Sequence, residues 1–222
     1  KDFGWLFSKV PASAAGTYTT NQFQAAPTKL TKQMIDQGHQ LQGLLLNSAI
    51  ANSCTGEQGW QNALQEQAWL ANKLNVAPNL IGVASTGLIG AQLPMDKIKN
   101  GLPQLTPTKS DAVTHAVLTT DQHPKTVCVQ CELSGQLVTL TGFAKGSGMI
   151  HPKMATMLGF VTTDAQIDGP VLQDMLSTNV DQTFNQITVD GDTSTNDMVV
   201  TLANGLADLS LIHISEPTRR TP

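Results

Sequence analysis

The chain has 222 residues, of which 40% are apolar, and a formal net charge of −4. This length suits one large domain or two small ones, and the charge gives no electrostatic reason to expect nucleic acid or an anionic membrane as a partner. No apolar run approaches the roughly 20 residues that span a bilayer, and the first residues lack the basic and apolar regions of a signal peptide. A small-molecule substrate is therefore expected.

Apolar periodicity and turn residues divide the chain into short strands and helices. In chain order, the pattern predicts strands at 5–10 and 17–20, a helix at 31–39, a strand at 41–49, a helix at 57–74, a strand at 79–85, helices at 96–99 and 110–118, strands at 126–133, 136–143 and 157–163, a helix at 171–184, a strand at 187–190 and a helix at 196–209. Strands and helices mix without strict alternation, which indicates an α+β fold.

Three cysteines are an odd number, which argues against a disulfide framework. Cys128 and Cys131 form a Cys-x-x-Cys pattern, but a zinc site needs a second pair or nearby histidines, and only His123 is close in sequence. In a hairpin strand the two thiols would face opposite sides. We expect ordinary thiols in a reducing cytosol and no metal site.

The segment at 145–160, KGSGMIHPKMATMLGF, carries the strongest functional signal. It sets a glycine-rich turn before the pair Ala155 and Thr156, which opens an apolar run. A threonine hydroxyl is a weak nucleophile until a base takes its proton. If the chain is cut before Thr156, the freed amine, whose pKa is about 7.7–8, can be that base. By residue type alone, a threonine here is far more often an ordinary strand residue.

Further segments support the same functional interpretation. They are AKGSGMIHPKMATMLGF at 144–160, ITVDGDTSTNDMVVTLANG at 187–205, NSAIANSCTGEQG at 47–59, VASTGLIG at 83–90 and LTTD at 118–121. Together they resemble, in the same order, the bifunctional glutamate N-acetyltransferase/ornithine acetyltransferase family of arginine biosynthesis. The resemblance covers nearly everything from Lys1 to about Leu209. Two departures are small: Lys153 stands where the family usually has asparagine, and NSAIAN replaces the commoner NSGNAN.

The resemblance implies a four-layer α-β-β-α arrangement, with a cut between Ala155 and Thr156. An α chain would cover residues 1–155, and a β chain would begin at Thr156 and cover 156–209 of this sequence. The implied enzyme is a cytoplasmic heterotetramer of two α and two β chains. It would pass acetyl from N2-acetylornithine to glutamate through an acetyl-threonine at position 156, without a cofactor. Whether acetyl-CoA serves as a second acetyl donor stays open.

Four further residues match positions with a role in this family. Thr86 and Gly87 match its oxyanion pair, and Lys145 and Thr119 match residues that contact substrate. A slip of one residue to Thr120 stays open. Without the resemblance, 85–87 reads as a strand-ending turn and Lys145 as a solvated lysine.

The acidic loop at 190–197 resembles the start of a calcium-binding loop. It does not match that pattern, because Thr195 and Thr201 stand where glycine and glutamate are required. We expect instead that Ser194 or Thr195 caps a following helix, with Asp197 in its first turn and a secondary part in shaping the site. We expect a structural role for His151.

Residues 210–222 read as a non-native tail, because both arginines of the chain lie there and the preceding helical pattern stops without a cap. This leaves two alternatives. One is an N-terminal-nucleophile aminopeptidase or amidase that passes the acyl group to water. The other is an inactive truncated fragment that lacks part of the site.

Overall fold

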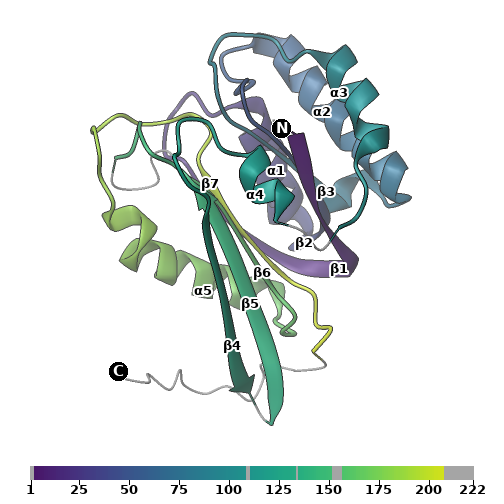
Figure 1. Cartoon of the computed structure of the whole chain (residues 1–222), viewed down its shortest axis with the longest axis vertical. Coiled ribbons are helices and arrows are strands. Elements are labelled where there is room, and N and C mark those ends of the chain that lie inside the picture. Colours follow the sequence, from purple (N-terminus) through teal and green to yellow (C-terminus); the bar gives the residue numbers. More distant parts are fainter. Residues whose placement is uncertain (1–2, 109–110, 134, 152–156, 208–222) are drawn as a thin grey trace.

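The computed structural model describes residues 3–108, 111–133, 135–151 and 157–207. Within these ranges the strands form a seven-stranded mixed sheet in the order β3-β2-β1-β7-β6-β5-β4 (Figure 1). The strands are β1 (Phe3–Tyr18), β2 (Gln40–Asn47), β3 (Ile81–Ser85), β4 (Lys125–Leu133), β5 (Gln136–Lys145), β6 (Leu158–Thr163) and β7 (Met198–Ala203). The helices are α1 (Ala26–Gly38), α2 (Gly56–Leu74), α3 (Met95–Gly101), α4 (Ala112–Ala116) and α5 (Gly169–Gln182), with 3₁₀ turns η1 (Pro78–Leu80), η2 (Leu102–Gln104) and η3 (Phe184–Gln186).

The long strand β1 joins the two halves of the sheet. Its first part pairs antiparallel with β2, and its last part, from Ser13 onward, pairs antiparallel with β7. The register with β2 shifts between Phe7 and Ala12. Pro11 lies in this shift, where a residue without an N–H is tolerated within a sheet. The prediction of two short strands around a turn is therefore wrong, because the irregularity absorbs the proline without reversing the chain.

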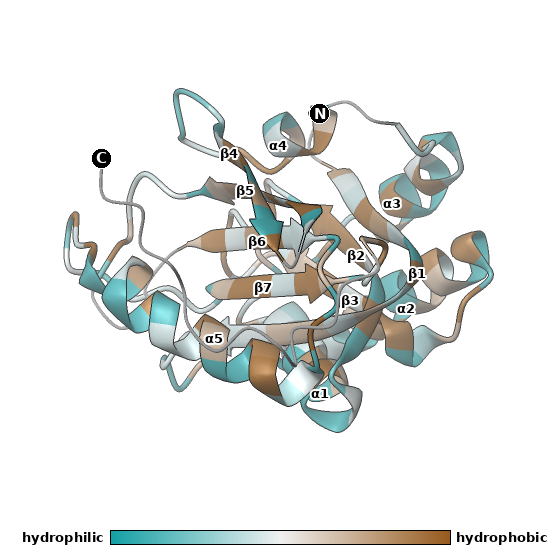
Figure 2. Cartoon of the chain, turned by 90° about the horizontal axis from the view of Figure 1, so that it is seen from below, coloured by the Kyte–Doolittle hydropathy of each residue, from teal (hydrophilic) through white to brown (hydrophobic). Residues whose placement is uncertain are grey.

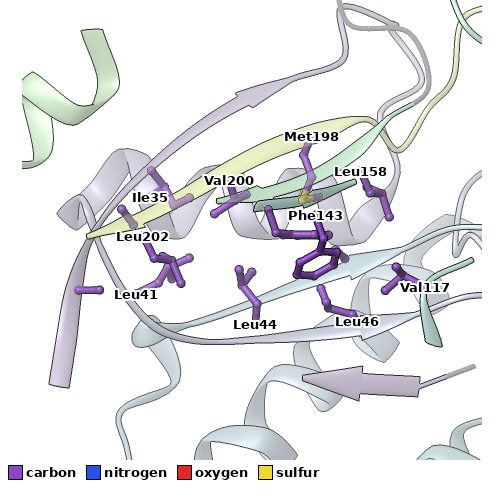
Figure 3. Close-up of a cluster of buried hydrophobic side chains, with 14 residues drawn as sticks. Ile35, Leu41, Leu44, Leu46, Val117, Phe143, Leu158, Met198, Val200 and Leu202 are labelled. Atoms are coloured by element: carbon purple, nitrogen blue, oxygen red, sulfur yellow. The ribbon is translucent and has the colours of Figure 1, made fainter. Parts of the chain in front are cut away.

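The two halves of the sheet pack face to face. Buried side chains from both halves form one cluster, which includes Leu44 and Leu46 of β2, Phe143 of β5 and Val200 of β7. Figure 3 shows the β2 leucines lying opposite Phe143 and Val200. Alternate residues of each strand point to one face, so this cluster fills the space between two β layers.

Helices cover both outer faces. Leu172, Leu176 and Val180 recur every four residues along α5 and pack against Val199 of β7. Figure 2 shows hydrophilic and hydrophobic residues interleaved along α5. On the other side, a third cluster includes residues of α1, α2, β2 and β3. The arrangement is α-β-β-α, as predicted.

The predicted hairpin is confirmed. β4 and β5 pair antiparallel around Gly135, whose φ of +80° suits a residue without a side chain. Cys54, Cys128 and Cys131 are free and exposed. Within the described ranges no three potential metal ligands gather in one place. No described helix has the length and apolar character needed to cross a membrane.

The chain after residue 196 is a strand, so the predicted helix at 196–209 is wrong. β7 lies between β1 and β6, and all six of its residues are buried. A strand covered on both faces shows no alternation of apolar and polar residues, and a short apolar run of this kind is ambiguous between strand and helix. The β-branched Val199, Val200 and Thr201 favour the strand. Residues 187–190, predicted as a strand, form a loop with a bend at its end instead.

Glu66 of α2 is a buried carboxyl with a measurable consequence. It is 1% exposed, and its Oε2 has no hydrogen-bond partner in the described part of the chain. Burial raises the pKa of Glu66 to about 8. A carboxyl of this kind must keep its proton in the folded protein while the unfolded chain releases it near pH 4.5.

We expect the Glu66→Gln variant to lose less stability than the parent between pH 5 and pH 8.5. The folded-state pKa is raised, so the parent's stability falls as pH climbs from the unfolded toward the folded value, at about 1.4 kcal/mol per pH unit in the limit. Denaturant unfolding at both pH values measures this difference. Glu57→Gln, on an exposed position of the same helix, is the control. Parallel pH curves for parent and Glu66→Gln would contradict the expectation.

Candidate active site

Two of the predicted site residues, Thr86 and Lys145, come from the two halves of the sheet and meet at one end of the interlayer core. Thr86 follows the end of β3, and Lys145 ends β5. The Lys145 Nζ donates to Thr86 Oγ1 over 3.1 Å. Lys145 also pairs in register with Leu158, the first residue of β6, which in turn pairs with Met198.

The predicted cleavage residues Ala155 and Thr156 lie outside the described residues. Met157, which follows them, is described, and its carbonyl oxygen accepts the N–H of Met198 over 3.1 Å. The chain therefore passes directly from the cleavage segment into β6, whose first residue, Leu158, is the register partner of Lys145.

Thr86 and Gly87 present two hydrogen-bond donors that have no acceptor within the described part of the chain. Thr86 N–H donates to the Asn47 carbonyl, while its Oγ1 accepts from Lys145, so the hydroxyl hydrogen stays available. The N–H of Gly87 has no acceptor among the described residues. Gly87 has a φ of +124°, and a Cβ there would lie 2.2 Å from the Ala49 carbonyl carbon. Only glycine fits this turn.

Lys145 is a buried cation. It is 5% exposed, so the alternative of a solvated lysine at a strand end does not hold. Burial lowers the pKa of the Lys145 ammonium; the charges of Asp121 and Asp197 act in the opposite direction, and that of Lys125 adds to the lowering. A buried ammonium needs acceptors, and in the described residues Thr86 supplies one.

The loop before β4 is tied to the glycine-rich turn, although not through Thr119. Thr119 is exposed and forms no hydrogen bond with another described residue. Thr120 Oγ1 lies 2.6 Å from Ser147 Oγ. The Asp121 carboxylate accepts the Gly146 N–H over 2.8 Å. Burial acts to raise the pKa of Asp121, but hydrogen bonds from Lys125 and Gly146 outweigh it and hold that pKa below its ordinary value.

Asp190 holds the turn that precedes the cleavage segment. Its carboxylate accepts the N–H of Met149 over 2.6 Å and that of Ile150 over 2.8 Å. These bonds lower the pKa of Asp190. Because no helix follows, the predicted capping role of this loop is wrong, and its first aspartate instead joins two loops distant in sequence. His151 is exposed.

The second half of the same loop anchors the segment at 47–53. Asn196 Nδ2 donates to the carbonyls of Ala51 over 2.6 Å and Ser85 over 2.9 Å. Thr195 accepts from the Ser53 hydroxyl over 2.6 Å and donates to Asn196 Oδ1 over 2.7 Å. Sequence reasoning assigned Thr195 to a helix cap, but it belongs to a buried network around the end of β3.

Asp197 is the residue of this loop that the sequence analysis placed wrongly, in the first turn of a helix. It is 2% exposed and directly precedes β7. Burial raises its pKa to about 8, against hydrogen bonds from Ser194 and the Met157 N–H and the charge of Lys145. The available signal was an acid immediately before an apolar strand. It was read as the first turn of a helix because β7 itself was read as helical.

A strained backbone at Ala49 supports the glycine turn. Ala49 has a φ of +80°, and its carbonyl oxygen accepts the Leu88 N–H over 2.8 Å. An L-residue in a left-handed conformation costs about 1–2 kcal/mol relative to glycine. We therefore expect Ala49→Gly to raise the free energy of unfolding by about 1 kcal/mol, measured by chemical denaturation. Ala51→Gly, at a buried position without positive φ, is the control and should destabilise.

A cavity of about 510 Å³ opens elsewhere on the surface. Phe23, Lys29, Glu57 and Trp60 are among its lining residues. It contains neither Thr86 nor Lys145, so it is separate from the site built here.

Comparison with known proteins gives consistent matches. A family model described as the ArgJ family matches residues 1–220. The chain is 54% identical over 219 residues to the arginine biosynthesis bifunctional protein ArgJ of Staphylococcus saprophyticus, with 97% of this chain and 53% of the relative covered. It is 55% identical over 218 residues to the protein of the same name from Oceanobacillus iheyensis, covering 97% and 54%. The chain thus spans about half the length of these curated relatives.

Solved structures agree. The crystal structure of arginine biosynthesis bifunctional protein ArgJ from Bacillus halodurans matches with a TM-score of 0.67 and 46% identity, over 70% of this chain and 83% of that one. Ornithine acetyltransferase from Mycobacterium tuberculosis, complexed with ornithine, matches with a TM-score of 0.57 and 32% identity, over 68% and 83%. An L-aminopeptidase D-Ala-esterase/amidase from Ochrobactrum anthropi, described as a variant of the Ntn hydrolase fold, shares the fold alone, at 12% identity, a TM-score of 0.54, and coverage of 88% and 61%.

Proposed function

Because the chain belongs to the ArgJ family, we propose that it forms part of a cytoplasmic enzyme that passes acetyl from N2-acetylornithine to glutamate in arginine biosynthesis. The observation that carries the proposal is the bond from Lys145 to Thr86 across the two halves of the sheet. This bond places the buried Lys145 ammonium beside two available donors, the Thr86 O–H and the Gly87 N–H. All three lie near the point where the chain passes from the Thr156 segment into β6. The activity is proposed for the protein at the full length of its relatives, since this chain spans about half of them.

Self-cleavage at Ala155–Thr156 is the first proposed step. The Thr156 hydroxyl oxygen attacks the Ala155 carbonyl carbon, the C–N bond breaks, and the nitrogen takes the hydroxyl proton. Water then hydrolyses the resulting ester, which leaves a carboxyl group on Ala155 and a free hydroxyl and amine on Thr156. The freed amine is the base that later turnover requires.

Transfer follows a ping-pong course. The Thr156 oxygen attacks the acetyl carbonyl of N2-acetylornithine, its amine takes the proton, and ornithine leaves with that proton as the amide bond breaks. Glutamate's amine then attacks the acetyl ester and restores the threonine. Thr86 O–H and Gly87 N–H would stabilise the oxyanion in both halves of the reaction. Lys145 would bind the substrate carboxylate and Thr119 would contact the substrate.

The second candidate is hydrolysis by the same threonine, supported by the shared fold of the aminopeptidase/amidase. In that case acetylornithine yields free acetate, with or without glutamate. Acetyl transfer to glutamate is favoured because the relatives at 54% and 55% identity are named as arginine biosynthesis proteins. Acetyl-CoA as a second donor is tested by the same assay with acetyl-CoA in place of acetylornithine.

The deciding experiment uses the protein extended to its relatives' length. N-terminal sequencing of the purified protein should find a chain that begins at Thr156, and native mass should correspond to two α and two β chains. Mixing it with acetylornithine and glutamate should yield acetylglutamate. An active protein that stays one intact chain would overturn the cleavage step, and acetate as the sole product would favour hydrolysis. The chain of 222 residues, assayed alone, should be inactive if the second half supplies part of the site.

A further inference from the structure

The buried ammonium of Lys145 has a neutral hydrogen-bond acceptor. Lys145 is 5% exposed, and its Nζ donates to the hydroxyl oxygen of Thr86 over 3.1 Å. A neutral hydroxyl does not offset the free-energy cost of burying a full positive charge. The charged form of Lys145 therefore depends on negative charge from a carboxylate nearby.

Asp121 is a carboxylate built into the end of the β4–β5 hairpin that carries Lys145. β4 begins at Lys125, which pairs in register with Ala144, the residue before Lys145. Asp121 Oδ1 accepts the N–H of Gly146, the residue after Lys145, over 2.8 Å, and it also accepts a bond from Lys125 Nζ. The residues on either side of Lys145 are thus both tied to the start of β4 and the loop before it.

The Asp121 carboxylate is buried more deeply than an anchor for the backbone requires. Its side chain is 0% exposed, while that of its partner Lys125 is 50% exposed. Its second oxygen, Oδ2, is buried and has no hydrogen-bond partner in the described part of the chain. Because water screens the half-exposed Lys125 ammonium, that ion pair does not cancel the negative charge of Asp121.

The charged groups that act on Lys145 are two carboxyls and one ammonium. Burial lowers the pKa of Lys145, the charges of Asp121 and Asp197 raise it, and that of Lys125 lowers it. Burial raises the pKa of Asp197 to about 8, so this carboxyl is largely protonated at pH 7. Burial also acts to raise the pKa of Asp121, but hydrogen bonds from Lys125 and Gly146 outweigh it and keep that pKa below its ordinary value. Asp121 is therefore the carboxyl that offers Lys145 a full negative charge near neutral pH.

We propose that Asp121 is a positioning residue for substrate binding, because it holds the Lys145 end of β5 through Gly146 and gives the buried ammonium its counter-charge. The inference rests on the proposed function, in which Lys145 binds the substrate carboxylate. A protonated lysine forms a charge-assisted hydrogen bond with a carboxylate, which a neutral amine cannot form. Loss of the Asp121 charge therefore weakens substrate binding without removing a group that contacts the substrate.

The test uses the protein extended to its relatives' length and matched substitutions. Asp121→Asn keeps the shape and an acceptor for Gly146 but has no charge, and Asp121→Glu keeps the charge on a longer side chain. Asp164→Asn is the control, since the Asp164 carboxylate also accepts a backbone N–H of β5, that of Thr139, over 2.8 Å. Steady-state kinetics with acetylornithine and glutamate are measured from about pH 7 to 9, below the ordinary lysine pKa of about 10.4.

We expect Asp121→Asn to raise the KM for acetylornithine by about 10-fold and to leave kcat within about 2-fold of the parent. The rise should grow with pH, because without the Asp121 charge the pKa of Lys145 falls further and its ammonium loses the proton at a lower pH. Asp121→Glu should restore most of the affinity, and Asp164→Asn should match the parent at every pH. A parental KM in Asp121→Asn across this range, or a larger KM in Asp121→Glu than in Asp121→Asn, would overturn the inference.

Failure of the proposed function gives a different result. The pKa of Lys145 is read directly by NMR from lysine labelled at Cε, with Lys145→Met used to assign the signal. It should be lower in Asp121→Asn than in the parent and in Asp164→Asn. If the parent transfers no acetyl and this difference appears, the proposed function fails and the link between Asp121 and Lys145 stands. An equal pKa in all three would remove the link, whatever the activity.

A variant of the opposite sign decides the matter if Asp121→Asn does not fold. Lys125→Gln changes a half-exposed side chain and removes the like charge that acts on Lys145. It also leaves the Asp121 charge without its paired cation, so the pKa of Lys145 should rise. An unchanged or lowered pKa of Lys145 in Lys125→Gln would contradict the inference.

Discussion

Replacing Thr156 by alanine should leave the full-length protein as one uncut chain with no measurable acetylglutamate formation. Alanine has no hydroxyl, so neither the attack on the Ala155 carbonyl nor the later acetyl ester can form. Denaturing gels, mass spectrometry and product assay measure the two losses separately. No other substitution proposed for this chain removes both steps at once, and the expected effect is the largest.

Thr156→Ser is the matched control for this result. Serine keeps a hydroxyl and, after cutting, a free amine, so it should be processed and should turn over, at reduced rates. If Thr156→Ala is still cut at the same bond, the threonine is not the attacking group. If it is uncut but active, the free amine is not the base that turnover needs.

The sequence predicted those elements whose apolar residues follow a simple period. The spacing of Leu172, Leu176 and Val180 predicted α5, and the alternating runs around Gly135 predicted the hairpin of β4 and β5. β7 was misread because a strand buried on both faces carries no period of two. β1 was misread because a proline in a bulge has the same sequence signal as a proline in a turn.

Part of the candidate site, like part of the fold, could be predicted from the sequence. Motif resemblance nominated Thr86, Gly87 and Lys145, and the fold brings these three together. That Lys145 is buried and bonded across the sheet could not be predicted from the sequence, because its partner lies 59 positions away and in the other β layer. The burial of Asp197 could not be predicted for a related reason: it depends on β7 lying between β1 and β6, and that neighbourhood is a property of the topology.

Thr119 shows that a motif match alone does not decide which of two neighbouring threonines contacts the substrate. The neighbouring Thr120, and not Thr119, reaches the glycine-rich turn through Ser147, and Asp121 holds the same turn through Gly146. The hydrogen bonds of the free protein orient this loop but do not decide which threonine contacts substrate. The proposal keeps Thr119 in that role, and separate Thr119→Val and Thr120→Val variants would distinguish the two by their effects on KM.

Thr86→Ala should lower kcat by about 10²-fold and change KM little. The Thr86 hydroxyl hydrogen has no acceptor in the described structure, so its bond would form mainly in the transition state, when charge develops on the acetyl oxygen. Steady-state kinetics with acetylornithine and glutamate, on fully processed enzyme, measure both constants.

The Thr86 side chain also contacts Lys145, and the test must separate the effect of that contact from the effect of the bond to the oxyanion. Thr86 Oγ1 also accepts from Lys145, so alanine removes an acceptor from a buried ammonium as well as a donor from the oxyanion. Thr86→Ser keeps both functions and should retain most of kcat, whereas Thr86→Val keeps the shape and loses both. A large rise in KM with normal kcat in Thr86→Ala would mean that Thr86 acts through Lys145 on substrate binding. Near-parental values of both kcat and KM would exclude Thr86 from the oxyanion site. The Gly87 N–H would then be the proposed donor to the oxyanion.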